Sequence, residues 1–174
     1  IEAIGVKTES EINSVDALIL PGGESTTIAK LARIFGVFEV IQQKIAAGFP
    51  VYGSCAGLIL LANKIIDGAE GQETFGGLEI TARRNAFGRQ VDSFEGEIDF
   101  AGIGKLNGVF IRAPWVESVG PEVKVLASVD GHPVAIRQGS LLATSFHPEL
   151  TGDNRVHRYF IDSVCKESVK VGSR

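Results

Sequence analysis

The stretch Phe49-Pro50-Val51-Tyr52-Gly53-Ser54-Cys55-Ala56-Gly57 decides the fold of this chain. A short apolar run ends at a cysteine that has one glycine two positions before it and another two positions after it, and residues 58–62 then begin a predicted helix. This order of strand, sharp turn and helix is the pattern of a nucleophile elbow, with sulfur in place of a hydroxyl. Small residues are needed beside the cysteine because strand and helix approach each other closely at such a turn.

Cys55 is therefore the predicted nucleophile of a catalytic site. The N-terminus of the following helix directs free N–H groups at the sulfur, so we expect Cys55 to favour the thiolate over the thiol. A free cysteine is more often a small buried apolar residue, and Cys165, in the last predicted helix, is assigned that role. The two glycines around Cys55 and its strand-to-helix context favour catalysis there.

Composition limits the kind of protein this chain can be. Its 174 residues suffice for one well-buried domain, and 44% hydrophobic with 22% charged residues is typical of a globular protein. The net charge of −4 argues against a nucleic-acid or anionic-membrane partner. Two cysteines make no disulfide framework, and no apolar run approaches membrane-spanning length. We expect a cytoplasmic protein with no membrane or nucleic-acid partner, no metal and no cofactor.

The apolar periodicity predicts alternating strands and helices in the first half of the chain. We expect strands over 1–7, 15–20 and 50–54, a turn over 8–14, and helices that begin near Glu24, near Val37 and at Ala56, the last running to about Lys64. The first helix would carry Leu31, Ile34 and Phe35 on one face.

The second half reads as rich in strands. After a polar loop over 68–77 we expect strands over 78–82, 90–100, 108–111, 124–129, 133–137 and 141–146, and a last helix over 154–165. The predicted fold class is α/β: a three-layer sandwich whose central sheet is mostly parallel, with antiparallel strands in the second half.

The start of the chain is unusual. It opens directly on a strand-like run from Ile1 and contains no methionine. Because an α/β domain usually opens with a strand and a helix, we expect an N-terminal segment holding the first strand and helix to precede residue 1. Residues 1–174 are otherwise expected to form a single domain.

His147 is the predicted base for Cys55, since a cysteine nucleophile needs a base and the base needs an orienting group. It ends an apolar strand and is followed by Pro148 and Glu149. A residue before proline prefers an extended backbone, which would place the side chains of His147 and Glu149 on one face. Glu149 would then hold one imidazole nitrogen while the other faces sulfur. His132, after a turn, and His157, on a helix, are less suitable.

Further candidates for the site follow two other predicted strands. Pro21-Gly22-Gly23 comes after a core strand, which suits an oxyanion hole, where a backbone N–H meets a developing negative charge. Arg112 ends the apolar strand that includes Ile111, an odd place for an idle charge. Arg84 and Arg112 are open between two roles, a solvated cation and a partner for a substrate carboxylate.

The pentapeptide Gly53–Gly57 together with His147-Pro148-Glu149 resembles the class I glutamine amidotransferases, which use a Cys–His–Glu triad. Longer strings over 20–27, 84–95, 110–114 and 145–151 are similar to a narrower family, the glutaminase subunits of pyridoxal 5′-phosphate synthase. The resemblance covers nearly the whole chain, and the string over 84–95 makes it specific.

The resemblance implies a flavodoxin-like glutaminase that hydrolyses L-glutamine to L-glutamate and ammonia through a thioester. It implies that ammonia is channelled to a (β/α)₈-barrel synthase subunit that makes pyridoxal 5′-phosphate (vitamin B6), in an assembly of twelve subunits of each kind whose docking activates the glutaminase. By motif, the glutamine site would comprise Gly22, Gly23, Glu24, Arg84, Ile111 and Arg112, and the oxyanion hole would comprise Gly23 and Ala56. The first strand and helix of the family have no counterpart in residues 1–174.

Alternatives remain open at this point. A glutaminase subunit of another amidotransferase, such as imidazole glycerol phosphate synthase, would use the same triad with a different synthase. A DJ-1-like non-hydrolytic cysteine module has a related fold and elbow, but it leaves His147-Pro148-Glu149 unexplained. Residues 87–95, including Arg89, are a candidate segment for signalling between a partner and the site.

Overall fold

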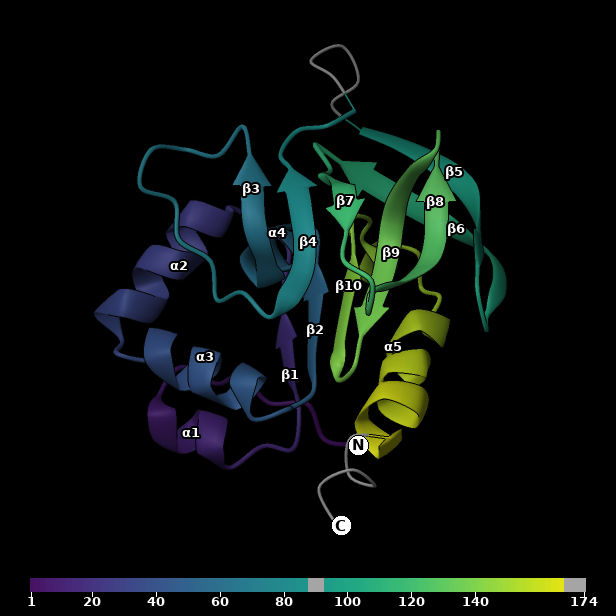
Figure 1. The fold of residues 1–174 in the computed structure, drawn as a ribbon. Helices are drawn as coiled ribbons and strands as arrows, with labels where there is room; N and C mark the ends of the chain where they lie inside the picture. The colour runs from purple at the N-terminus through teal and green to yellow at the C-terminus, as the bar shows by residue number, and fades with distance from the viewer. Residues whose placement is uncertain (88–92, 168–174) are drawn as a thin grey trace.

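A mixed α/β fold with a central five-stranded sheet is seen in the computed structural model, which describes residues 1–87 and 93–167 (Figure 1). The sheet has the strand order β1-β2-β10-β9-β8. The first three strands in this order are parallel, and β9 and β8 are antiparallel to their neighbours, as expected for the second half of the chain. The five strands are β1 (Leu18–Leu20), β2 (Val51–Ser54), β8 (Lys124–Val129), β9 (His132–Gln138) and β10 (Leu141–Thr144).

Two smaller sheets accompany the central one. A three-stranded sheet has the order β3-β4-β7, and a two-stranded antiparallel hairpin joins β5 to β6. Their strands are β3 (Ala62–Ile66), β4 (Leu78–Arg83), β5 (Ser93–Phe100), β6 (Gly104–Ile111) and β7 (Trp115–Val119).

Helices lie on both sides of the central sheet, which gives the expected layered arrangement. Figure 1 shows α1, α2 and α3 on one side and α5, in yellow, on the other. The helices are α1 (Glu9–Asn13), α2 (Ser25–Ile34), α3 (Phe38–Ala46), α4 (Ala56–Leu61) and α5 (Arg155–Tyr159), which continues as a π-helix over Phe160–Cys165. Across residues 1–87 and 93–167, no helix has the length and apolar character needed to span a bilayer.

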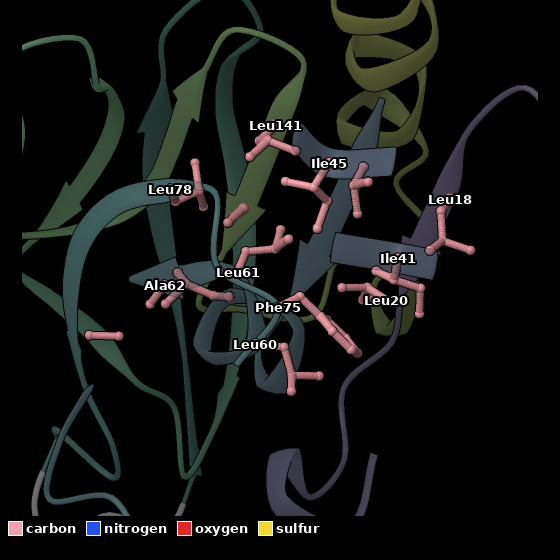
Figure 2. Packing of buried hydrophobic residues seen from close by; sticks show 14 of the residues in the cluster. Leu18, Leu20, Ile41, Ile45, Leu60, Leu61, Ala62, Phe75, Leu78 and Leu141 are labelled. Atoms are coloured by element: carbon pink, nitrogen blue, oxygen red, sulfur yellow. The ribbon is translucent and has the colours of Figure 1, made fainter. Parts of the chain in front are cut away.

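Two apolar clusters fill the space on the two faces of the sheet. The first packs the helices over 25–61 against the strands, and Figure 2 labels Leu18, Leu20, Ile41, Ile45, Leu60, Leu61, Ala62, Phe75, Leu78 and Leu141 within it. The second includes Tyr52, Phe100, Phe110, Phe146 and Phe160. Every residue of β2 and of β10 is buried, because both faces of these strands are covered.

The first fourteen residues differ from the prediction. Residues 1–7 form no strand, and α1 replaces the predicted turn over 8–14. Thr8 caps α1: its hydroxyl accepts from the Glu11 N–H at 3.3 Å, and the Glu11 carboxylate accepts from the Thr8 N–H at 2.9 Å. A strand forms only where its backbone finds a partner ladder, whereas this capping box stabilises a helix locally.

The buried face of α2 also differs from the prediction. Leu31, Ile34 and Phe35 are exposed, and the buried residues of the helix are Ser25, Ala29 and Ala32. Helix α2 packs against α4, and small side chains let two helices approach closely. The apolar stripe read from the sequence therefore lies on the outer face.

Several boundaries move because distant strands pair. Helix α4 ends at Leu61 instead of near Lys64, and β3 follows at once, paired in parallel with β4. Strand β7 was not predicted, and the helix predicted over 154–165 divides into α5 and a π-helix. The strand predicted over 90–100 is present from Ser93. Residues 88–92, which include Arg89 of the proposed signalling segment, lie outside the described residues.

Candidate active site

Cys55 occupies the sharp turn between β2 and α4. Its backbone has φ 50° and ψ −100°, a strained conformation for a residue with a side chain. A Cβ added at Gly53 would lie 2.5 Å from the Gly57 carbonyl, and one added at Gly57 would lie 2.5 Å from the Leu20 carbonyl oxygen. Both glycines are thus required by close approach, as predicted, and the Cys55 N–H ties the turn to β10 by donating to the Thr144 carbonyl at 2.8 Å.

The protonation of the thiol differs from the expectation. The pKa of Cys55 is raised to about 11, chiefly by burial and to a smaller extent by the nearby carboxylates of Glu149 and Glu24. The Ala56 backbone N–H and the Arg112 guanidinium lower the pKa, but less than burial raises it. The N-terminus of the short helix therefore does not bring the pKa of Cys55 below its ordinary value.

His147 and Glu149 form the expected pair. The distance from His147 Nδ1 to Glu149 Oε1 is 2.7 Å. Pro148 and Glu149 belong to a 3₁₀ turn, Pro148–Leu150, instead of an extended strand. The His147 side chain is 11% exposed, and its backbone N–H donates to the Val109 carbonyl on β6 at 2.8 Å. An ionised Glu149 accepts a hydrogen bond from Nδ1–H, which leaves Nε2 free to accept a proton.

The predicted oxyanion turn lies against this histidine. A Cβ added at Gly22 would come within 2.4 Å of His147 Cε1, so the backbone of the turn touches the imidazole ring. Gly23 has φ 127°, which L side chains rarely adopt. Among the residues described, none offers a backbone acceptor to the Gly23 N–H. The Ala56 backbone N–H interacts with the Cys55 sulfur, and the Gly23 N–H remains a predicted second oxyanion donor.

The end of β6 reaches the sulfur from another side. The carbonyl oxygen of Ile111 lies 4.0 Å from Cys55 Sγ. Arg112 follows with φ 42°, is exposed, and is near enough to lower the pKa of Cys55 electrostatically. Arg112, which stands at the end of an apolar strand in the sequence, therefore lies at the candidate site.

Arg84 and Glu24 form an ion pair next to the start of α2. Arg84 Nη2 donates to Glu24 Oε1 at 2.6 Å, and the arginine side chain is only 16% exposed. Arg84 Nη1 also donates to Gln72 Oε1 at 3.0 Å. Gln72 was not a candidate from the sequence, because it lies in the polar loop over 68–77 and belongs to no motif.

The described residues show no hydrogen bond between the Cys55 thiol and the His147 ring. Catalytic hydrogen bonds in ligand-free enzymes are often long and tighten on binding. The other two histidines pack against aromatic rings: His132 stacks on Trp115 with ring centroids 3.6 Å apart, and His157 packs edge-on to Tyr52.

The arrangement can perform nucleophilic acyl transfer. It combines a thiol, an imidazole hydrogen-bonded to a carboxylate, and the Ala56 backbone N–H beside the sulfur. Cys165 lies outside this group, and burial raises its pKa. Across the part of the chain that the structure describes, no cluster of His, Cys, Asp or Glu could hold a metal ion.

Comparison with known families gives one match over most of the chain. Residues 1–166 match the family described as the SNO glutamine amidotransferase family. That range includes every residue of the candidate site.

Curated relatives are similar over most of their length. The pyridoxal 5′-phosphate synthase subunit PdxT of Mycobacteroides abscessus is 58% identical over 164 residues, which cover 94% of this chain and 85% of that protein. The protein of the same name from a Nocardioides species is 60% identical over 173 residues, covering 96% of this chain and 86% of the relative.

Solved structures agree on the fold. A crystal structure of a glutamine amidotransferase has a TM-score of 0.88 and 48% identity, covering 93% of this chain and 86% of that one. A glutamine amidotransferase from Thermotoga maritima has a TM-score of 0.55 at 12% identity, covering 92% of this chain and 67% of its own, and supports the fold alone.

Proposed function

Because the chain belongs to the SNO glutamine amidotransferase family, we propose that it hydrolyses glutamine and supplies the ammonia to a pyridoxal 5′-phosphate synthase. It is the glutaminase subunit of that enzyme, with Cys55 as nucleophile, His147 as base and Glu149 as the group that orients His147. The observation that carries the proposal is the strained Cys55 turn together with a histidine that is hydrogen-bonded at 2.7 Å to Glu149, a carboxylate close enough to act on the Cys55 thiol.

The first half-reaction forms a thioester. His147 Nε2 takes the proton of Cys55 as the sulfur attacks the side-chain amide carbon of glutamine. The carbonyl oxygen becomes an oxyanion, which the N–H groups of Gly23 and Ala56 stabilise. The proton then moves from His147 to the amide nitrogen, the C–N bond breaks and ammonia leaves.

The second half-reaction releases glutamate. His147 takes a proton from a water molecule, whose oxygen attacks the thioester carbon. The C–S bond breaks, the sulfur regains a proton and glutamate departs. Glu149 keeps the imidazole oriented and stabilises its protonated form in both halves.

The α-amino and α-carboxyl groups of glutamine need partners of opposite charge. Glu24 and Arg84 lie side by side and match a zwitterion, with the carboxylate toward the ammonium and the guanidinium toward the carboxylate. Gly22, Gly23, Ile111 and Arg112 complete the binding site. The Ile111 carbonyl, 4.0 Å from the sulfur, faces the region that the substrate amide would enter.

The assembly extends beyond this chain. Residues 1–174 act as one glutaminase domain that docks on a (β/α)₈-barrel synthase, with twelve copies of each subunit and with ammonia passed between them. The site needs a reduced thiol, which suits the cytoplasm. Light scattering of the mixed subunits would measure the stoichiometry.

Glutamate release from glutamine tests the proposed function. It should be measured with and without a pyridoxal 5′-phosphate synthase barrel and with an imidazole glycerol phosphate synthase barrel, beside a Cys55→Ala control. We expect activity that rises with the first barrel and is lost in the control. Activity raised only by the second barrel would reassign the pathway. A fully active Cys55→Ala variant would overturn the mechanism, and an inactive wild-type complex would overturn the proposed activity.

A further inference from the structure

The side chain of Gln72 joins three parts of the molecule. Its Nε2 donates to Ser25 Oγ at 2.7 Å, in the first turn of α2. Its Oε1 accepts from the Ala69 backbone N–H at 3.2 Å and from Arg84 Nη1 at 3.0 Å. One amide thus links its own loop, the start of α2 and the guanidinium that pairs with Glu24.

These bonds explain how Arg84 is held. A guanidinium presents its donors in a planar fork, so two acceptors at different nitrogens define its plane. Glu24 accepts from Nη2 and Gln72 accepts from Nη1. A bound substrate that engages Glu24 through its ammonium weakens that carboxylate's hold on Arg84. Gln72 is neutral and is the acceptor that keeps Arg84 oriented at that moment.

The loop that carries Gln72 is incompletely packed against α2. A hollow of about 340 Å³ lies between the loop and α2, lined in part by Lys30, Glu70 and Gln72 itself. Ser25, by contrast, is 1% exposed and offers a firm anchor. The side-chain hydrogen bonds of Gln72 therefore position its amide, and losing them deprives Arg84 of one of its two side-chain acceptors.

We propose that Gln72 is a positioning residue for the amino-acid end of the substrate, acting through Arg84. The inference rests on the proposed glutaminase function and adds a residue that determines affinity. Gln72 touches neither the sulfur nor the amide that is hydrolysed. Its removal weakens binding of glutamine and leaves the chemical step unchanged.

The test compares Gln72→Ala with Gln42→Ala in the complete complex with the synthase subunit. Gln42 is a matched control, because its Nε2 donates to the Phe75 carbonyl of the same loop at 3.4 Å and it does not contact Arg84. We expect Gln72→Ala to raise KM for glutamine by about tenfold with kcat within about twofold, and Gln42→Ala to change neither. In an Arg84→Ala background, Gln72→Ala should raise KM no further.

Calorimetric binding of glutamine to the Cys55→Ala complex separates this inference from the proposed function. Weaker binding in the Cys55→Ala, Gln72→Ala double variant supports the role of Gln72 even if the wild-type complex shows no turnover. An unchanged KM in an active Gln72→Ala complex overturns the inference and leaves the glutaminase intact. Equal losses from Gln72→Ala with and without Arg84 would also overturn it, since they indicate a general effect on the loop.

Discussion

Cys55 combines a reactive side chain with a backbone conformation that glycine would adopt more easily. A non-glycine residue at φ 50° and ψ −100° holds strain of about 1–3 kcal/mol. The turn persists because β2, α4 and β10 hold it from three sides, including the hydrogen bond from the Cys55 N–H to the Thr144 carbonyl. These contacts keep the backbone in its strained conformation and hold the sulfur at the tip of the turn.

Comparing Cys55→Gly with Cys55→Ala isolates this strain. Both variants lack the sulfur, and only alanine keeps a Cβ at the strained position. We expect Cys55→Gly to have a free energy of unfolding about 1–2 kcal/mol higher than Cys55→Ala, measured by urea denaturation. Equal stabilities would show that the turn is relaxed.

The raised pKa of the Cys55 thiol predicts a pH dependence of stability. The pKa of the thiol is 9.0 in an ordinary setting and about 11 in the folded protein. Between these values the unfolded chain releases a proton that the folded protein retains, so stability is full below pH 9 and falls as pH rises to 11. Over this pH range the free energy of unfolding of the wild type should fall by about 2–3 kcal/mol more than that of Cys55→Ala.

Urea denaturation of both proteins at several values from pH 8 to pH 11 measures that difference. Lysine and tyrosine titrations are common to the two proteins and cancel. Parallel pH profiles would contradict a buried, protonated thiol.

The raised pKa of Cys55 also predicts its reactivity: iodoacetamide should alkylate Cys55 of the free protein more slowly at pH 8 than it alkylates a small thiol.

At the scale of elements, the junction of β1, β2 and α4 is tightly packed. Helix α4 approaches β1 so closely that the Leu20 carbonyl oxygen fills the position of a side chain at Gly57. Neither the Leu20 carbonyl nor the Gly57 Cα can move aside as a flexible side chain could, because both belong to the backbone. The glycines two positions before and two positions after the cysteine are therefore needed because helix and strand approach each other closely there.

Gly57→Ala should lower the free energy of unfolding by about 2–3 kcal/mol or more and abolish activity, because the helix must move away from β1. Gly96→Ala, in β5, is the matched control, since a Cβ there meets nothing within 4 Å. Its effect should stay within about 0.5 kcal/mol. Thermal unfolding followed by circular dichroism checks both, and a stable, active Gly57→Ala variant would contradict the close packing.

Other elements show where local pattern is insufficient. Residues 56–64 read as one helix, yet the chain turns into β3 at Ala62 because β4 offers a partner ladder. The apolar stripe of α2 is a correct reading of spacing, but the buried face is the one that carries Ala29 and Ala32. In both places contacts with distant segments outweigh the local preference.

At the scale of the whole molecule, the central sheet has a core on each face. Phe38, 1% exposed, lies in the cluster on the α2 and α3 side, and Phe160, 2% exposed, lies in the other. Both apolar clusters pack against β2 and β10, so we expect the described chain to unfold as one cooperative unit.

Phe38→Ala and Phe160→Ala should each lower stability by about 3–5 kcal/mol in a single unfolding transition. Phe35→Ala is the control, because Phe35 is 56% exposed and its loss should change stability by less than about 1 kcal/mol. Circular dichroism and tryptophan fluorescence of Trp115 should report the same midpoint in every variant. Separate transitions for the two core variants would show two independent units.

The sequence by itself determined the features that depend on neighbouring residues. The elbow at Cys55, the glycines on either side of it and the pair His147 and Glu149 are local patterns, and the structure shows the close approach at both glycines and the His147–Glu149 hydrogen bond, the latter through a 3₁₀ turn instead of an extended backbone. The α/β class follows equally from short apolar runs that alternate with amphipathic helices.

Only the tertiary structure decided the features that join distant segments. Gln72 meets Ser25 and Arg84 across 47 and 12 residues of chain, and no local pattern records such contacts. The pKa of Cys55 was wrongly expected to fall, because a helix N-terminus is visible in the sequence and burial is not. Pairing, burial and charge around a buried atom arise from groups that come together only in the folded chain, so they are decided there.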